Sequence, residues 1–335
     1  MFIAQKRTYS LPWYQTNTKT YSAGGTPFYV DEPPSRVDRA FYDSETTSLV
    51  TSANLTQRKT YFSCFGSNTK GYCIGGMTSL SYIPSLNADK ITYSNDTTTA
   101  QASANLPEAT SDHRGTGNSL AMYSYGGSSG QNTYDKTTAY KTTFSNDTTS
   151  TQTSANLSTA RGQGTVLSTQ TSALYFGGYK NTPVSFSLQT TADKMPFTTD
   201  TTSANGSLTL PYALAAGGNG SMTAELSKCG YLPSGAPDPG QPTIYWMKVN
   251  YQTDSVSTTS ANFPTISTST GARRVTSYSS HSSRTTGYTM GGYVNRVDFQ
   301  PETTRAYKMP FSTEAVSAVT AMNKTYASAG CGGLG

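Results

Sequence analysis

Charged, histidine and tryptophan side chains are scarce in this 335-residue chain: 13% of its residues are charged, and it has two histidines and two tryptophans. The net charge is only +5, and basic residues form no cluster larger than an adjacent pair such as Arg273-Arg274, which argues against nucleic-acid binding. No apolar run is long enough to cross a membrane, and residues 1–14 lack the apolar core of a signal peptide. We therefore expect a protein that is made in the cytoplasm and does not insert into a membrane.

Cysteine is also scarce, and the four cysteines show no Cys-x-x-Cys or Cys-His spacing that would indicate a zinc site. Cys64 and Cys73 are equidistant from a turn expected at Asn68-Thr69, so the two can face each other across a hairpin. Such a pair can form a disulfide at a non-hydrogen-bonded position, but we expect a reduced pair in a chain without an export signal.

An internal repeat is the strongest pattern in the chain. Each copy carries a cation, an aromatic residue three positions later and an acid three positions after that, without gaps. Successive copies are 51, 51, 53, 54 and 60 residues apart, a period typical of repeat architectures. The cations are Arg39, Lys90, Lys141, Lys194, Lys248 and Lys308, the aromatic residues are Tyr42, Tyr93, Phe144, Phe197, Tyr251 and Phe311, and the acids are Glu45, Asp96, Asp147, Asp200, Asp254 and Glu314.

The residues around this motif predict strands, and no 3.6-residue apolar period predicts a helix. The residue after each cation shares a strand face with the aromatic residue, as Ile91 does with Tyr93, which is typical of a half-buried strand. The Asn and Asp residues that follow, such as Asn95-Asp96, suit a tight hairpin turn. A further strand ends in Ser-Ala-Asn-Leu, as at residues 103–106. In the fourth copy the gapless count places Leu210 at this leucine position, although residues 203–205 also read Ser-Ala-Asn.

A second hairpin upstream of each cation ends in a glycine pair, at residues 24–25, 75–76, 126–127, 177–178 and 291–292, with Ser234-Gly235 in copy five. Each copy is therefore predicted to hold four short antiparallel strands. One such unit cannot bury both of its faces, whereas units stacked around an axis can. We predict an all-β, six-bladed β-propeller, a single domain over residues 1–335, with blades at about residues 6–55, 56–106, 107–157, 158–210, 211–263 and 264–323.

The end of the chain is expected to close the ring. Residues 323–327 resemble residues 58–62, which open the inner strand of blade two. Residues 324–331 are therefore expected to form one extra inner strand that pairs with blade one, next to residues 6–14 or in their place. Residues 324–335 are thus a closing strand or a tail.

The glycine pair at the end of the second strand resembles the repeat of kelch-like propellers. The segment at residues 89–106, with Ala160-Arg161-Gly162 and residues 174–178, is more similar still to the propeller repeats of tailed bacteriophages, particularly phages of aquatic bacteria. This resemblance covers about residues 15–330 and is closest in copies two to four. Cellular kelch proteins usually carry a Tyr and a Trp in each blade, whereas this chain has only Trp13 and Trp246. The resemblance implies a kelch-like propeller in a virion, commonly in the tail or fibres, exposed on the particle and used at the host surface.

The residues do not predict catalysis or metal binding. His113 and His281 do not align within their blades, and a copper oxidase site needs two histidines and tyrosines that converge. Acids are few, six of them occupy the repeated turn position, and the Asp box of sialidase propellers is absent. One acid in each turn, such as Asp96, supplies too few oxygens for calcium. We expect no enzyme activity, no cofactor and no metal, and the repeated cations are expected to form salt bridges or to be solvated.

Candidate binding residues lie in the connections between strands two and three and in a long blade-to-blade insert at residues 265–286. These segments vary most between blades and place aromatic and charged side chains on one face. Tyr and Trp offer large rigid surfaces with a polar tip, which suit sugars and protein partners, although each residue could instead simply cover the propeller. The candidates are Tyr29, Asp31, Glu32, Tyr179, Lys180, Tyr231, Trp246, Arg273, Arg274, Tyr293 and Arg296.

Two functions remain open at this point. In the first, a non-enzymatic virion subunit presents these loops to a glycan or another receptor at the host surface. In the second, a purely architectural subunit of a virion or extracellular filament binds only neighbouring subunits. The expected partners are other virion proteins, host surface polysaccharide, and further copies of the chain in a homo-oligomer or a symmetric assembly.

Overall fold

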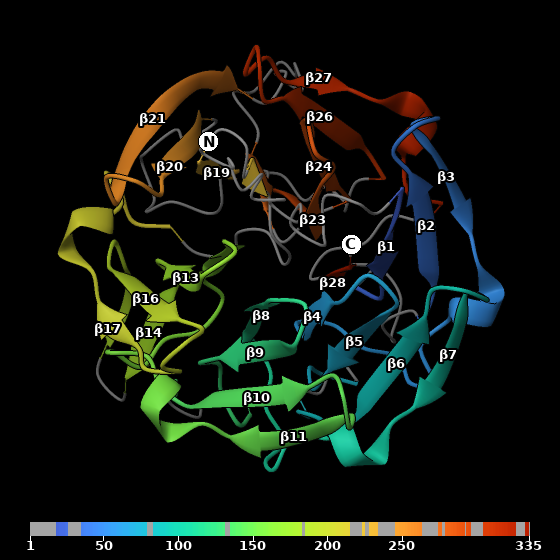
Figure 1. Ribbon diagram of the computed structural model, residues 1–335, viewed down its shortest axis with the longest axis horizontal. Helices are drawn as coiled ribbons and strands as arrows, with labels where there is room; N and C mark the ends of the chain where they lie inside the picture. Colours follow the sequence, from blue (N-terminus) through green and yellow to red (C-terminus); the bar gives the residue numbers. More distant parts are fainter. Residues whose placement is uncertain are drawn as a thin grey trace, which may run out of the picture.

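Six four-stranded antiparallel sheets surround one axis as the blades of a β-propeller in the computed structural model (Figure 1). The described residues contain no α-helix, so the predicted all-β, six-bladed fold is confirmed. The structure describes residues 18–25, 35–78, 83–130, 135–182, 185–214, 223–224, 228–233, 245–262, 274–276, 279–291, 293–295, 304–325 and 332–334.

Blades two to six each take their four strands from one copy of the repeat. Blade two contains β4 (Ser63–Gly66), β5 (Lys70–Ile74), β6 (Ala88–Thr92) and β7 (Thr97–Ala100), and blade three contains β8 (Arg114–Gly117), β9 (Ala121–Tyr125), β10 (Ala139–Thr143) and β11 (Thr148–Thr151). Blade four contains β12 (Thr165–Ser168), β13 (Ser172–Phe176), β16 (Ala192–Pro196) and β17 (Ser203–Ala204). Blade five contains β18 (Thr223–Ala224), β19 (Cys229–Leu232), β20 (Tyr245–Asn250) and β21 (Ser255–Asn262), and blade six contains β23 (Ser279–Ser282), β24 (Thr286–Met290), β26 (Ala306–Pro310) and β27 (Ser317–Ala318).

Blade one is completed by the end of the chain. Its inner strand is β28 (Gly332–Leu334), which pairs with β1 (Lys19–Ala23) and is followed across the sheet by β2 (Val37–Phe41) and β3 (Thr46–Leu49). Figure 1 shows β28 close to the axis beside β4, with β3 at the rim. The expected closure by the C-terminal segment is confirmed, but the closing strand is residues 332–334 rather than 324–331. Residues 6–14 lie outside the described residues.

The closing strand was misplaced because the alignment of residues 323–327 was four positions out of register. The side-chain oxygen of Asn323 accepts a hydrogen bond from the first residue of β26, as that of Asn54 does from the first residue of β2. Asn323 therefore occupies the repeated asparagine position in copy six, and Lys324 takes the buried leucine position that follows it. Counting on from there, Gly332 matches Ser63, the first residue of β4.

The strand order distributes the connections over two faces of the propeller. The turn face carries the turns between strands one and two and between strands three and four. The insert face carries the connections between strands two and three and between blades. Connections on the insert face also form two two-stranded antiparallel ribbons. In one, β14 (Tyr179–Thr182) pairs with β15 (Ser185–Leu188), and in the other, β22 (Arg274–Thr276) pairs with β25 (Tyr293–Asn295).

Among the described residues, short 3-10 helices follow the outer strand in five blades, and in blades one to three they end with the Ser-Ala of the Ser-Ala-Asn-Leu motif. In the fourth copy Leu210 is buried and its N–H bonds to the carbonyl of Thr190, as the N–H of Leu106 does to that of Leu86, so the gapless count is confirmed. In copy five, β21 instead continues through residues 260–262 after a bulge. The helices are Thr51–Ala53, Ala102–Ala104, Thr153–Ala155, Gly206–Leu208 and Thr320–Met322.

Glycine and proline are used at the ends of strands. Gly75 and Gly76, after β5, have φ values of 67° and 86°. A Cβ atom on them would lie 2.7 Å from the carbonyl oxygen of Thr110 and 2.6 Å from that of Thr60, so only glycine fits this close approach. Pro196 and Pro310 end β16 and β26, where a missing N–H costs no ladder hydrogen bond.

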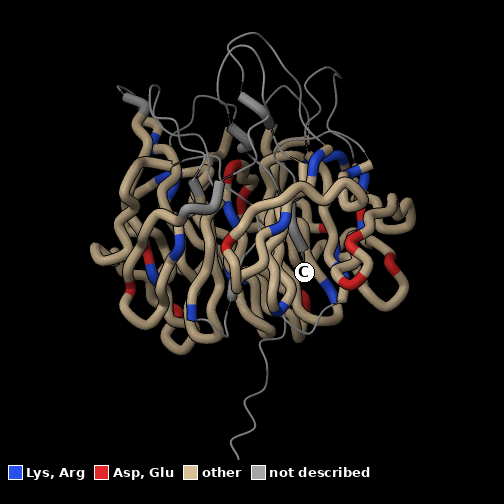
Figure 2. The backbone as a smooth tube through the Cα atoms, turned by 90° about the horizontal axis from the view of Figure 1, so that it is seen from above, with Lys and Arg blue, Asp and Glu red and all other residues tan. Residues whose placement is uncertain are grey.

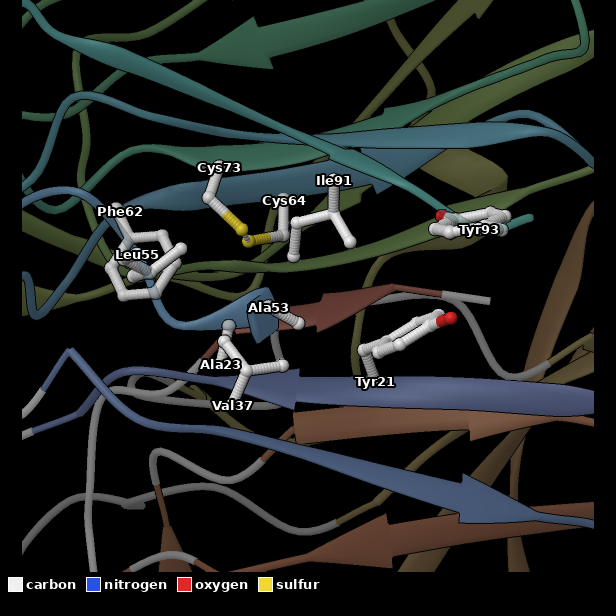
Figure 3. Packing of buried hydrophobic residues seen from close by; sticks show 10 residues of the cluster. All are labelled: Tyr21, Ala23, Val37, Ala53, Leu55, Phe62, Cys64, Cys73, Ile91 and Tyr93. Carbon is white, nitrogen blue, oxygen red and sulfur yellow. Dashed lines mark hydrogen bonds between the residues drawn. The ribbon is translucent and has the colours of Figure 1, made fainter. Parts of the chain in front are cut away.

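The hydrophobic core is divided among the seams between neighbouring blades. Figure 3 shows the cluster between blades one and two, where Tyr21 and Val37 of blade one face Cys64, Ile91 and Tyr93 of blade two. Similar clusters fill the seams between blades two and three, three and four, four and five, and six and one. Each blade is therefore stabilised mainly by its neighbours, as expected for a stacked repeat.

Candidate functional site

The residues of the repeat motif join neighbouring blades near the turn face. At the seam between blades two and three, Lys90 Nζ lies 2.7 Å from Asp147 Oδ2, and Lys70 and the Tyr72 hydroxyl donate to Asp147 Oδ1. The Phe144 ring stacks on Tyr72 with their centroids 5.4 Å apart. The cations and tyrosine belong to blade two, whereas Asp147 and Phe144 belong to blade three. We call this arrangement an interblade clasp.

The ion pair of the clasp recurs at all six seams, including the one that closes the ring between blades six and one. Each acid adopts a left-handed backbone conformation, with φ between 47° and 55°, which suits the predicted hairpin turn. Between blades four and five, Leu174 replaces the tyrosine that the second strand of every other blade provides, and Asn205 donates a hydrogen bond to Asp254 instead. The pairs are Arg39–Asp96, Lys90–Asp147, Lys141–Asp200, Lys194–Asp254, Lys248–Glu314 and Lys308–Glu45.

The electrostatics of the clasp favour an ionised acid. Partial burial of Asp147 opposes ionisation, but hydrogen bonds from Lys70, Lys90 and Tyr72 outweigh it and lower the pKa of Asp147 to about 2. Desolvation and the same hydrogen bond raise the pKa of the Tyr72 phenol, so Tyr72 remains a donor. The expected salt-bridge role of the repeated cations is thus confirmed, with each partner in the next blade.

We expect Asp147→Asn to lower the free energy of unfolding by about 1–2 kcal/mol at neutral pH, the range for a hydrogen-bonded charge at a partly exposed site. Because the folded-state pKa is depressed, this contribution is present above the unfolded pKa of about 3.9 and is lost as the pH falls towards about 2. Urea denaturation of both proteins between pH 7 and pH 2 measures the difference. Asp43→Asn, an exposed acid in the corresponding turn of blade one, is the control, and an equal loss in both variants would contradict the clasp.

Both histidines are buried in seams. His113 Nε2 lies 3.1 Å from the carbonyl oxygen of Ile74, between blades two and three. His281 Nδ1 lies 2.7 Å from Thr20 Oγ1, between blades six and one. Burial lowers the pKa of each imidazole to about 3, so both are neutral at physiological pH. Because both imidazoles are buried and contact residues of the neighbouring blade, we assign both histidines a role in packing.

Two of the predicted binding residues are buried in strands. The expectation that Tyr231 lies in the connection between strands two and three is wrong, because it belongs to β19 and its hydroxyl donates to Glu314 Oε1 at 2.8 Å. Tyr231 is the clasp tyrosine of blade five. Trp246 lies in β20 and is fully buried, so it also presents no surface to a ligand.

The structure places four other predicted residues on the insert face, in two separate ribbons. Tyr179 and Lys180 begin β14 and are partly exposed. Arg274 begins β22 and Tyr293 begins β25, so pairing of these strands joins the blade-to-blade insert to the connection between strands two and three of blade six. The remaining candidates lie outside the described residues: Tyr29, Asp31, Glu32, Arg273 and Arg296.

A polar cluster on the insert face had not been predicted. Asp112 Oδ1 accepts a hydrogen bond of 2.6 Å from Gln163 Nε2, and Asp135 Oδ2 accepts one of 2.5 Å from the backbone N–H of Asn181 in β14. Burial raises the pKa of Asp135 to about 7, to which neighbouring Asp112 contributes. The cluster anchors the β14–β15 ribbon to blade three. Asp112 and Gln163 are 51 residues apart and occupy the same position of the repeat. The sequence did not indicate this equivalence, because the two side chains differ.

A groove with a volume of about 510 Å³ opens on the insert face at blade two. Its walls are the connection into blade two, the connection between its second and third strands, and the connection into blade three. Leu86 is 38% exposed there, and the adjoining Ile83 is 59% exposed. The Asn87 side chain donates to Gln57 Oε1 at 2.7 Å. The lining residues are Gln57, Arg58, Thr78, Pro84, Ser85, Leu86, Asn87 and Ala109.

The groove has the size and chemistry of a small-ligand site. Pockets of about 300–1,000 Å³ that combine apolar surface with a few polar groups are typical of such sites. Amide and guanidinium groups can hydrogen-bond to hydroxyl or carboxylate oxygens, while Leu86 and Pro84 provide apolar contact. The sequence did not identify this groove, because three separate connections form it and they come together only in the folded ring.

Neither the charge distribution nor comparison with known proteins identifies a function for this chain. In Figure 2 the Lys and Arg residues are interspersed with Asp and Glu around the body of the propeller. Among the described residues, no helix has the length and apolarity needed to span a membrane. No protein-family model matches the chain, and no curated protein matches it in sequence. The structural basis for a function is therefore the difference between the turn face, with its clasps, and the insert face, with its blade-specific connections.

Proposed function

We propose that this protein is a non-enzymatic virion subunit whose insert face binds polysaccharide at the host surface. The observation that carries the proposal is that the two faces differ in which residues they contain. Side chains shared by all blades are engaged in clasps near the turn face. Blade-specific features, namely the groove at blade two and the two additional ribbons, belong to the insert face.

This division is typical of a rigid scaffold that presents variable loops. The six clasps and the strand that closes the ring hold the blades in fixed positions, so the insert face is preorganised before a ligand arrives. Both histidines are engaged in seams, which favours binding over catalysis. The resemblance of the repeats to bacteriophage propellers supports placement in a tail or fibre.

Polysaccharide is the ligand class that best suits the groove. Sugar rings present both hydroxyl groups and apolar C–H faces, and the groove offers amide and guanidinium groups beside Leu86 and Pro84. Exposed Ile83 extends the apolar surface at its edge. A long polymer can bind at low affinity per site and still attach firmly when several subunits of a particle engage it.

Binding of fluorescently labelled protein to candidate host cells, with and without their surface polysaccharide, tests the proposal. We expect staining that depends on the polysaccharide. Leu86→Asp should weaken it by about tenfold or more, equivalent to about 1.4 kcal/mol, because a charge replaces an apolar contact. The matched control is Leu120→Asp, which alters a 71% exposed leucine in a turn of the opposite face.

The outcomes of this experiment distinguish polysaccharide binding from a purely architectural role in the particle. An equal loss of staining in both variants would indicate that the substitutions impair folding. Urea denaturation of each variant measures this effect separately. Binding that is unaffected by Leu86→Asp would place the ligand elsewhere on the insert face. Absence of staining on every polysaccharide-bearing host would overturn the proposal in favour of a purely architectural subunit that binds only its neighbours in the particle.

A further inference from the structure

Cys64 and Cys73 face each other across the innermost hairpin of blade two. They are directly opposed in the register of β4 and β5, as their equal distance from the turn had predicted. Figure 3 shows the two sulfur atoms pointing towards each other, and the Sγ atoms are 2.7 Å apart. The structure holds both residues as thiols, and neither side chain is exposed.

The backbone geometry at this pair suits a disulfide. The N–H of Ser67 bonds to the carbonyl of Lys70, which makes that pair hydrogen-bonded. Hydrogen-bonded and non-hydrogen-bonded pairs alternate along an antiparallel ladder, so Cys64 and Cys73, three pairs away, form a non-hydrogen-bonded pair. The Cα atoms of such pairs are about 4.5 Å apart, within the range of about 4.4–6.8 Å that a disulfide spans.

The surroundings protect the pair in the folded protein. Leu55, Phe62, Ile91 and Tyr93 belong to the same buried cluster, which also includes Tyr21 of blade one. A reagent therefore cannot reach either sulfur while blades one and two are stacked. Oxidation must occur before the two blades close over the hairpin or during a local opening of this seam.

We propose that Cys64 and Cys73 are the site of a structural disulfide that forms when the folding chain meets a small-molecule disulfide oxidant. The thiolate of one cysteine attacks the oxidant, forms a mixed disulfide and releases one thiol. The second thiolate then attacks the protein sulfur of that mixed disulfide and releases the other thiol. The protein loses two protons and two electrons, and one oxidant molecule is reduced to two thiols.

The bridge would stabilise the blade on which ring closure depends. β4 lies beside the closing strand β28 and beside β8 of blade three, so the hairpin contributes to two seams (Figure 1). A covalent link across β4 and β5 restricts the unfolded chain and so raises the stability of the folded one. A chain made in a reducing cytoplasm would gain this link only in a more oxidising environment.

Refolding of the full chain from urea, in reduced or oxidised glutathione, tests the proposal. The refolded protein is denatured again and labelled with N-ethylmaleimide. The oxidised sample should take up two fewer labels than the reduced sample, which has four reactive cysteines. Peptide mapping should recover the segments that contain Cys64 and Cys73 as one linked species, and the urea midpoint of the oxidised protein should be higher.

The control variant is Cys73→Ala, whose urea midpoint should be the same in both glutathione buffers. The labelling of wild-type protein keeps the test decisive if this variant does not fold. Four labels on an oxidised protein that has regained its β-sheet circular dichroism spectrum would overturn the proposal. A linked species that joins Cys229 or Cys331 instead of the proposed pair would overturn it as well.

Discussion

Removal of residues 326–335 should open the propeller and lower its melting temperature by roughly 10 °C or more, the shift expected for a loss of several kcal/mol in a domain of this size. The deleted segment contains β28, which supplies the inner strand of blade one through pairs such as Ser22 with Gly333. Without it, the inner edge of β1 is left unpaired, and β4 and β23 lose a neighbour.

This truncation ends after Thr325 for a structural reason. The backbone N–H and the hydroxyl of Thr325 both donate to the buried Asp38 carboxylate, so a shorter chain would also leave that acid without these donors. Differential scanning calorimetry measures the melting temperature, and removal of Gly335 alone is the control because β28 is retained. Equal melting temperatures for the 1–325 chain and the full chain would show that β28 does not close the ring.

Phe144→Ala should lower the free energy of unfolding by about 3–5 kcal/mol, the usual cost of deleting a buried phenylalanine ring. Phe144 is 5% exposed and lies in the cluster between blades two and three, parallel to the ring of Tyr72. Its loss removes apolar contact from two blades at once and leaves a cavity behind the clasp of Asp147.

Urea denaturation at neutral pH measures this cost. Phe197→Ala is the matched comparison, because Phe197 occupies the same repeat position but is only partly buried against Tyr123. We expect a smaller loss for Phe197→Ala. A loss below about 1 kcal/mol for Phe144→Ala would be typical of a surface site and would contradict the assignment of this ring to the core.

The repeat predicted the fold because strand alternation, hairpin turns and glycine pairs are local signals that recur with a constant period. The partners within each clasp could not be read in the same way. Lys90 and Asp96 are close along the chain, yet Lys90 pairs with Asp147 in the next blade. Stacking of blades determines this choice, and the spacing within one copy contains no information about it.

The candidate site was predicted less well, since it depends on the segments that the copies do not share. Tyr231 could have been identified, because the alignment of Ser234-Gly235 with the glycine pairs makes it equivalent to Tyr72 and Tyr123. The groove at blade two could not, because it is formed by three separate connections that only the folded ring brings together. The polar cluster around Asp112 has the same origin.

The clasp gives every blade a direction. Each blade offers a cation to the blade that follows it and an acid to the blade that precedes it, as Lys90 and Asp96 do in blade two. A gene segment that encodes one whole copy therefore carries the cation half of one clasp and the acid half of another, and its duplication or exchange leaves every seam with a matched pair. Whole-copy duplication or exchange is thus compatible with the pairing at every seam, and it sets no requirement on the connections of the opposite face.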